Sequence, residues 1–223
     1  MGRLLVIEGV DGSGKATQSA RLAERLKQEG INPITLTFPD YDSDSSVIVK
    51  KYLAGDFGKN ASDVTPKIAS TFFAVDRYVS YKTKWQDSYN AGEVIIADRY
   101  TTSNMIHQAS KLDSDKEKDE FLNWLEDFEY NVYSLPRPDL TIFLDVPEEV
   151  GAELCKARAN KITGEAVQDI HESDREYIKK SYENAKFIAK KYSWKIIDCV
   201  KDGKMRSIED IHEEIFSYVK ELL

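Results

Sequence analysis

The chain has 223 residues, of which 41% are hydrophobic and 31% charged, and its formal net charge is −8. This length and composition are typical of one globular domain with a full hydrophobic core, which excludes a disordered or fibrous protein. The acidic balance argues against non-specific binding to nucleic acid, which needs a basic surface. The apolar run at the N-terminus is too short for a signal sequence, and no stretch approaches the length of a membrane span. Two isolated cysteines, Cys155 and Cys199, indicate reduced thiols, so we expect a cytoplasmic protein without nucleic-acid or membrane partners.

Short β-type segments alternate with longer helical patterns, which is typical of a parallel sheet covered by helices. The predicted strands, each rich in Val, Ile, Leu or Phe, are Leu4–Glu8, Pro33–Phe38, Val94–Asp98, Leu140–Asp145 and Lys195–Asp198. The predicted helices are Lys15–Glu29, Val47–Leu53, Thr65–Tyr89, Asp115–Phe128, Glu148–Ala159, Asp174–Tyr192 and Ile208–Leu222. Gly30 is expected to end the first helix, and Thr65 with Pro66 to begin the third. We therefore predict a single α/β domain over residues 1–223, built on a five-stranded parallel sheet flanked by helices.

A glycine-rich loop follows the first predicted strand and leads into the first predicted helix. Its sequence, Gly9-Val10-Asp11-Gly12-Ser13-Gly14-Lys15, is the P-loop pattern GxxxxGK in the context that the pattern requires. Glycines let successive backbone N–H groups converge on phosphate oxygens, and the helix N-terminus adds partial positive charge. Lys15 supplies a point charge at the β- and γ-phosphates. The predicted ATP-binding residues are Gly9, Val10, Asp11, Gly12, Ser13, Gly14, Lys15, Ala16 and Thr17.

The loop departs from the pattern at Ala16, which replaces the Ser or Thr whose hydroxyl normally contacts Mg²⁺. Thr17 lies about 100° further around the helix and cannot take over that contact. The sequence leaves two possibilities: carboxylates and water hold the metal, or the chain turns over slowly.

The tripeptide Asp98-Arg99-Tyr100 stands at the carboxyl end of the strand Val94–Asp98. Ligands bind at this edge of open parallel sheets. A carboxylate there can hold Mg²⁺ through water, and a guanidinium can grip a phosphate with two hydrogen bonds. We therefore predict Asp98 near a metal and Arg99 at a phosphate, in preference to a salt bridge that only caps the next helix.

Two helices carry polar and aromatic side chains suited to a nucleotide. Phe73, Asp76 and Arg77 share one face of the long predicted helix. An aromatic ring there can stack on a base while a guanidinium one turn later hydrogen-bonds the edge of that base, although Phe73 alone would be assigned to the core. The helix that begins beside Asp98 presents a polar face made of Tyr100, Ser103, Asn104, His107 and Gln108.

With these segments in place, the chain resembles the thymidylate kinase family, in its bacterial form, over nearly its whole length. The resemblance rests on Ile7–Lys15, Phe38–Tyr41, Phe73–Arg77, Asp98–Asn104 and Pro138–Leu140. Many families share the P-loop, whereas the combination of Phe-Ala-Val-Asp-Arg with Asp-Arg-Tyr-x-x-Ser is much more specific. The resemblance implies the P-loop nucleoside monophosphate kinase fold and ATP-dependent phosphorylation of dTMP to dTDP in dTTP biosynthesis.

The resemblance also implies the roles of the acceptor-site residues. Phe73 would stack on thymine, Arg77 would bond its carbonyl edge, and Arg99 would hold the dTMP phosphate. Asp11 would meet the 3′-hydroxyl of the sugar. The full set implied for dTMP binding is Asp11, Phe38, Tyr41, Phe73, Arg77, Arg99, Ser103, Asn104 and His107.

On the donor side, the resemblance implies a LID over Asn160–Glu172 that closes over ATP. The implied catalytic residues are two cations at the start of the LID and two in the central site: Arg158, Lys161, Lys15 and Arg99. The implied cofactor is Mg²⁺, with ATP as co-substrate, and the implied metal-associated carboxylate is Asp98, with Asp11, Asp169 or Glu172 as further candidates. The family further implies a homodimer packed through the helix Thr65–Tyr89.

Besides Ala16, two residues depart from the family pattern and keep alternatives open. Asp40 stands where many members have an arginine facing the nucleotide phosphate, and His107 stands where bacterial members often have a tyrosine near the sugar. One alternative is a deoxynucleoside kinase, which would need a carboxylate base such as Glu8 or Asp40. The other is a nucleotide-binding P-loop protein with little turnover.

Overall fold

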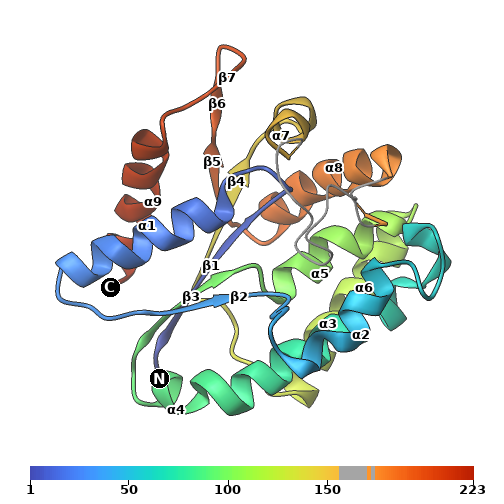
Figure 1. The fold of residues 1–223 in the computed structure, drawn as a ribbon, viewed down its shortest axis with the longest axis horizontal. Helices are drawn as coiled ribbons and strands as arrows, with labels where there is room; N and C mark the ends of the chain where they lie inside the picture. Colours follow the sequence, from blue (N-terminus) through green and yellow to red (C-terminus); the bar gives the residue numbers. More distant parts are fainter. Residues whose placement is uncertain (156–169, 172–173) are drawn as a thin grey trace.

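The molecule is built on one parallel sheet of five strands, seen in a computed structural model that describes residues 1–155, 170–171 and 174–223 (Figure 1). The strands are β1 (Arg3–Gly9), β2 (Ile34–Thr37), β3 (Val94–Asp98), β4 (Leu140–Asp145) and β5 (Lys195–Asp198), arranged in the order β2-β3-β1-β4-β5. The predicted sheet is confirmed, with β2 two residues shorter than expected. Because all five strands are parallel, their carboxyl ends meet at one edge, where Ile7 pairs with Asp98 and Gly9 with Leu144.

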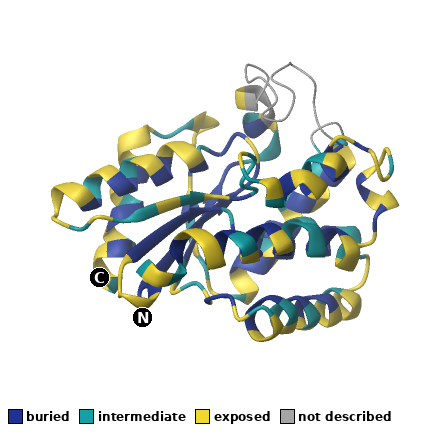
Figure 2. Cartoon of the chain, turned by 60° about the horizontal axis from the view of Figure 1, so that its bottom comes forward, coloured by how far each residue is buried: buried dark blue, intermediate teal, exposed yellow. Residues whose placement is uncertain are grey.

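Helices cover both faces of the sheet, so that the strands are buried between two layers (Figure 2). Alternate residues of β1 point to opposite faces. Leu5 and Ile7 pack with α1 (Lys15–Gln28) and α9 (Ile208–Leu222). Leu4 and Val6 pack in the cluster on the other face. That second face is covered by α5 (Thr101–His107), α6 (Asp115–Glu126), α8 (Arg175–Lys191) and the helical segment that continues α3 (Pro66–Ser80).

Most predicted helices are confirmed with small changes at their ends. Gly30 adopts φ 87° after α1, and its N–H donates to Lys27 O at 3.0 Å, as a glycine C-cap should. Asp174 caps α8 by accepting from Tyr177 N. Further elements of the described chain are α2 (Val47–Leu53), α7 (Glu148–Cys155) and the 3-10 turns Asp44–Ser46, Ala61–Asp63 and Ala109–Lys111. The predicted end of α7 at 156–159 lies outside the described residues, and no helix of the described chain is long and apolar enough to cross a membrane.

The predicted long helix over Thr65–Tyr89 is confirmed as one helical run from Pro66 to Asn90, although its middle part is not α-helical. Thr65 precedes the helix as predicted, although its side chain makes no capping bond. Helix α3 ends at Ser80, a π turn covers Tyr81–Trp85, and α4 (Gln86–Asn90) follows. The wide turn keeps the aromatic rings of Tyr81, Trp85 and Tyr89 in the core, with centroids 4.7 and 6.0 Å apart. A second π turn, Asp127–Val132, replaces the predicted last turn of α6.

A short antiparallel hairpin after β5 was not predicted. Its strands, β6 (Val200–Lys201) and β7 (Lys204–Met205), have only two residues each, which is too short for an apolar pattern. The turn between them is Asp202-Gly203, with φ 52° and 73°. An Asp-Gly pair with two positive φ angles is typical of a tight hairpin, so this dipeptide was the available signal.

Candidate active site

The P-loop joins β1 to α1 at the carboxyl edge of the sheet. Gly14 precedes α1 with φ 88°, and the helix begins without a side-chain cap, which leaves the N–H groups of its first turn to an anion. A Cβ at Gly9 would lie 2.4 Å from Ser13 Oγ, so this close approach requires glycine. Ser13 Oγ is itself buried without a hydrogen-bond partner among the described residues. A phosphate oxygen would satisfy this orphaned group.

Lys15 lies against the loop that it follows. Its Nζ donates to Gly9 O and Val10 O, both at 2.9 Å, and lies 3.9 Å from Asp11 Oδ1. The residue is 7% exposed, and burial, aided by the charge of Arg99, lowers the pKa of its ammonium to about 8. The ammonium of the predicted lysine therefore lies inside the P-loop, where it is only weakly hydrated.

Arg99 connects the P-loop to α5. Its Nη2 donates to Asp11 Oδ1 at 2.5 Å, and its Nη1 lies 3.2 Å from His107 Nε2. Burial disfavours the charged form, but the carboxylates of Asp11 and Glu8 outweigh it and raise the pKa of the guanidinium further. Burial and the same guanidinium lower the pKa of His107 to about 3, so a neutral imidazole accepts from Arg99. Arg99 is thus a permanent cation held at both ends of its fork.

Glu8 organises the start of α5 from inside the sheet. Its Oε1 accepts from Thr102 Oγ1 at 2.6 Å, Ser103 Oγ at 2.8 Å and Tyr100 N at 3.3 Å. The residue is fully buried, and burial raises the pKa of its carboxyl group. Because internal donors occupy this carboxylate, the geometry argues against Glu8 as the base of a deoxynucleoside kinase.

Glu129 is a second internal carboxylate, which sequence reasoning missed. Its oxygens accept from Arg77 Nε at 2.7 Å and Arg77 Nη2 at 2.5 Å, from Thr101 Oγ1 at 2.8 Å and from Asn104 Nδ2 at 3.1 Å. The side chains of Arg77 and Glu129 are 2% and 0% exposed. Nε and Nη2 of Arg77 are thus engaged by Glu129, and no hydrogen bond joins its Nη1 to another described residue. The guanidinium therefore has one end, rather than its whole fork, left to donate to a ligand.

The three predicted residues on α3, Phe73, Asp76 and Arg77, do not form a single binding face. Phe73 packs edge-on against Tyr52, with ring centroids 6.1 Å apart. Asp76 accepts from Asp40 N at 2.8 Å and Ser45 Oγ at 2.6 Å, so it holds the loop after β2. Each of the two residues, like Arg77, has its own partner, and Asp76 positions protein backbone rather than ligand.

The loop after β2 carries the other predicted acceptor residues. Phe38 is buried against Tyr100, and Tyr41 O accepts from Lys50 Nζ at 3.0 Å. Asp40, the departure from the family pattern, forms an ion pair with Lys84.

The predicted polar face of α5 is largely internal. Tyr100 is fully buried and donates to Pro136 O at 3.1 Å, and Gln108 is 1% exposed. Tyr100 and Gln108 are therefore core residues, and their assignment to a polar face is wrong. Ser103, Asn104 and His107 remain beside Arg99 and Arg77 through the contacts to Glu8, Glu129 and Arg99.

Asp98, the first of the predicted metal-associated carboxylates, lies at the carboxyl edge of the sheet. It ends β3 beside the P-loop, is 4% exposed and acts electrostatically on both Lys15 and Arg99. No group of three or more His, Cys, Asp or Glu side chains gathers among residues 1–155, 170–171 and 174–223. One carboxylate with substrate phosphates and water is a donor set that suits Mg²⁺. Arg158, Lys161, Asp169 and Glu172 lie outside the described residues.

Comparison with known proteins decides the family. A family model described as thymidylate kinase matches residues 7–215. The chain belongs to the thymidylate kinase family. A probable thymidylate kinase of Pyrococcus horikoshii is 30% identical over 98% of this chain and 96% of the relative. The thymidylate kinase of Mycobacterium tuberculosis is 34% identical over 78% of this chain and 79% of the relative.

The thymidylate kinase fold is also shared in three dimensions. The structure of thymidylate kinase from Candida albicans matches with a TM-score of 0.70 at 22% identity, covering 98% of this chain and 91% of that chain. Family membership and the P-loop nucleoside monophosphate kinase fold, both predicted from the motifs, are confirmed. Relatives from archaea and bacteria match at comparable identity, so the bacterial form is not singled out.

Proposed function

We propose that this member of the thymidylate kinase family transfers the γ-phosphoryl group of ATP to dTMP between the P-loop and α5. The observation that carries this proposal is the placement of Arg99. Its guanidinium bridges Asp11 and His107 beside Lys15, at the sheet edge where the P-loop ends. A cation held there can meet an acceptor phosphate in line with the γ-phosphate on the loop.

The reaction needs no general base, because the acceptor phosphate is already ionised at neutral pH. The protein contributes positioning and charge neutralisation in a loose transition state. Lys15 serves the donor phosphates and Arg99 the acceptor, and we assign Arg158 and Lys161 to the transferred group. A LID over 160–172 would exclude water and suppress hydrolysis of ATP.

On the acceptor side, we assign base recognition to Phe73 and to the Nη1 end of Arg77. Ser103 and Asn104 line the base pocket, and Asp11 meets the 3′-hydroxyl. Phe38, Tyr41 and His107 complete the acceptor site. We place the enzyme in the cytoplasm, where its co-substrate ATP is available.

Mg²⁺ is the cofactor that the donor set fits. We propose that Asp98 holds it together with the phosphates and water, because Ala16 supplies no hydroxyl; Asp11, Asp169 and Glu172 are the further candidates. Bound there, the metal would neutralise charge on the β- and γ-phosphate oxygens.

An ADP-release assay over dTMP, dUMP, dCMP, dGMP, UMP, AMP and thymidine tests the proposal. We expect the highest kcat/KM with dTMP, and loss of turnover when Mg²⁺ is omitted. Turnover with thymidine but not dTMP would instead establish a deoxynucleoside kinase. Nucleotide binding without ADP release on any acceptor would establish a binding protein.

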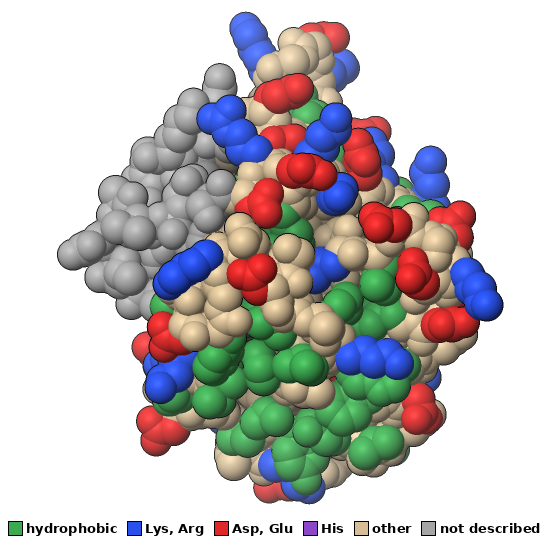
Figure 3. Space-filling model, turned by 90° about the vertical axis from the view of Figure 1, so that its right-hand side faces the viewer, with side chains coloured by type: hydrophobic (Ala, Val, Ile, Leu, Met, Phe, Trp, Pro, Cys, Tyr) green, Lys and Arg blue, Asp and Glu red, His purple; other side chains and the backbone are tan. Residues whose placement is uncertain are grey.

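We further propose a homodimer packed through α3. Ile68, Val75 and Tyr78 recur on the outer face of α3 and are 52%, 42% and 38% exposed. Hydrophobic side chains gather on the side of the molecule where α2, α3 and α6 lie (Figure 3). Such a contiguous patch is typical of a protein interface. Sedimentation velocity should give a species of twice the chain mass of 25.5 kDa, and a monomer at micromolar concentration would contradict the dimer.

A further inference from the structure

Side chains of α8 donate hydrogen bonds to the carbonyl groups at the end of α5. Asn184 Nδ2 donates to Met105 O at 3.0 Å and to Ile106 O at 2.7 Å. Tyr177 Oη donates to the next carbonyl, His107 O, at 3.0 Å. The last carbonyls of a helix lack partners within the helix, so donors from another element can fix its end. Three successive carbonyls of α5 are held from α8 in this way.

Asn184 is buried where α8 meets the end of α5. It is 3% exposed, and its Oδ1 is buried without a hydrogen-bond partner among the described residues. The orientation of the amide follows from its neighbours, because only the NH₂ group can donate to two carbonyl oxygens. The side chain therefore directs both of its donated hydrogen bonds to the end of α5.

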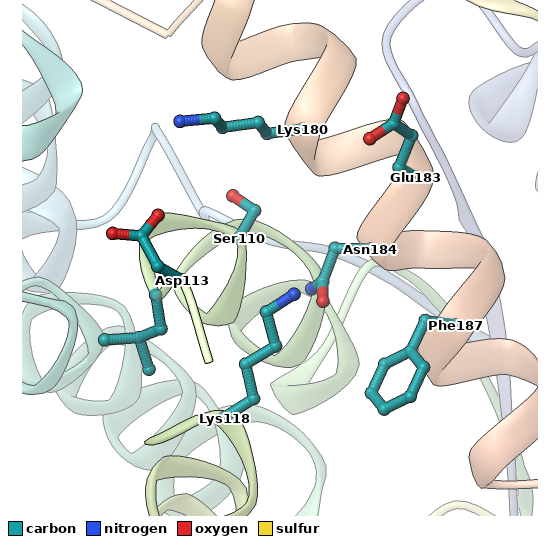
Figure 4. Close-up of a pocket in the computed structure, with 8 residues that line it drawn as sticks. Ser110, Asp113, Lys118, Lys180, Glu183, Asn184 and Phe187 are labelled. Atoms are coloured by element: carbon teal, nitrogen blue, oxygen red, sulfur yellow. The ribbon is translucent and has the colours of Figure 1, made fainter. Parts of the chain in front are cut away.

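Asn184 lies at a groove between α8 and the segment that follows α5. Figure 4 shows Asn184 projecting from α8 toward the segment that carries Ser110, at the wall of a groove of about 270 Å³. Ser110 Oγ donates to His107 O at 2.9 Å and lies 3.1 Å from Ser181 Oγ of α8. The end of α5 is thus bound to α8 through several contacts.

The position of α5 matters because this helix carries residues of the proposed acceptor site. His107 Nε2 lies 3.2 Å from Arg99 Nη1, and Ser103 and Asn104 lie one turn earlier. We propose that Asn184 is a positioning residue of the acceptor site: its two hydrogen bonds fix the last turn of α5, and thereby His107 and Arg99. This inference rests on the proposed assignment of the acceptor site. An error in the place of reacting groups, even a small one, lowers the rate strongly.

Asn184→Asp tests the inference with almost no change in volume. An ionised carboxylate cannot donate, and it faces two carbonyl oxygens. We expect the KM for dTMP to rise about tenfold or more while the KM for ATP changes less than about twofold, because only α5 is displaced. Asn184→Ala should likewise raise the KM for dTMP more than the KM for ATP. Tyr177→Phe, which deletes the hydroxyl that donates to His107 O, should raise the KM for dTMP by less.

Gln18 offers a matched control on the opposite face of the sheet. It is also 3% exposed, its Nε2 donates to Ile208 O at 3.0 Å, and its Oε1 is buried without a partner in the described chain. Gln18→Glu should lower Tm as Asn184→Asp does, but leave the KM for dTMP unchanged. The inference would be overturned if Gln18→Glu and Asn184→Asp changed this KM equally. It would also be overturned if Asn184→Asp lowered Tm without changing this KM. Should Asn184→Asp not fold, an unchanged KM for dTMP in Tyr177→Phe would overturn it.

Arg99→Ala separates this inference from the assignment on which it rests. A raised KM for dTMP in Arg99→Ala together with no change in the Asn184 variants rejects only the role of Asn184. An unchanged KM for dTMP in Arg99→Ala rejects the acceptor-site assignment, and with it the role of Asn184.

Discussion

Replacing Lys15 by methionine is expected to lower kcat about 10²–10³-fold while the protein stays folded. Lys15 is 7% exposed and its ammonium lies within the P-loop, where it would face the phosphates of a bound nucleotide. A cation in a poorly hydrated site stabilises developing negative charge more strongly than it would in water. Methionine keeps the length of the aliphatic chain and removes only the charge.

The pH dependence of kcat/KM for ATP gives a second readout of the same residue. Since the pKa of Lys15 is lowered to about 8, the ammonium loses its proton as the pH rises through that value. We expect kcat/KM for ATP to fall above about pH 8, because this ratio reports the protonation states of the free enzyme. The residual activity of Lys15→Met should lack this alkaline limb.

Lys27→Met is the matched control for the Lys15 experiment, because Lys27 is an exposed lysine in the last turn of the same helix. It should retain the kinetic constants and pH profile of the wild-type enzyme. The P-loop assignment is wrong if Lys15→Met keeps more than about a tenth of the wild-type kcat.

The P-loop and the sheet could be predicted because their signals are local in sequence. Apolar runs marked the five strands, and the glycine spacing marked the loop whose Gly14 takes φ 88°. The parallel arrangement then brought Asp98 and Arg99 to the same edge as Lys15, as expected from the carboxyl ends of β1 and β3. Family membership followed from these motifs and is confirmed.

The internal carboxylates could not be predicted, because their partners are distant in sequence. Glu129 lies 52 residues from Arg77, in a π turn that the helical pattern of α6 does not predict. Glu8 is adjacent to the P-loop, but its donors begin 92 residues later. The sequence pattern shows which polar residues α5 carries. It does not show that Glu8 and Glu129 would accept hydrogen bonds from most of them. The roles in binding dTMP stay predictions.

Replacing Arg77 by methionine is expected to lower the free energy of unfolding by about 3–5 kcal/mol, because it leaves the carboxylate of Glu129 buried without its counter-ion. The two side chains are 2% and 0% exposed and form two hydrogen bonds. The double variant Arg77→Met with Glu129→Gln should recover most of this loss. Its neutral glutamine can accept from Asn104 through its carbonyl oxygen and donate to the hydroxyl of Thr101 through its amide. Chemical denaturation of the single and double variants measures the difference.

The double variant also isolates the role of Arg77 in choosing the base. Thymine presents a carbonyl at C4 where cytosine presents an amino group, and a guanidinium only donates. Arg77 Nη1 would therefore bond thymine and oppose cytosine. We expect Glu129→Gln alone to keep the preference for dTMP over dCMP, and the double variant to reduce this preference about tenfold or more, since a buried donor discriminates strongly against a mismatched partner.

Phe73 and its neighbour Phe72 separate stacking from core packing within the same site. Both rings contact Tyr52, with centroids 6.1 and 5.9 Å away, so both alanine variants remove a similar core contact. Stacking on a base does not read its edge, so Phe73→Ala should raise KM for dTMP and dCMP alike. Phe72→Ala should lower Tm and leave both KM values unchanged.

If the double variant keeps the full dTMP preference, Arg77 serves only to balance the charge of Glu129. If Phe73→Ala matches Phe72→Ala in every constant, its ring belongs to the core, and base recognition must be sought among Ser103, Asn104 and Tyr41.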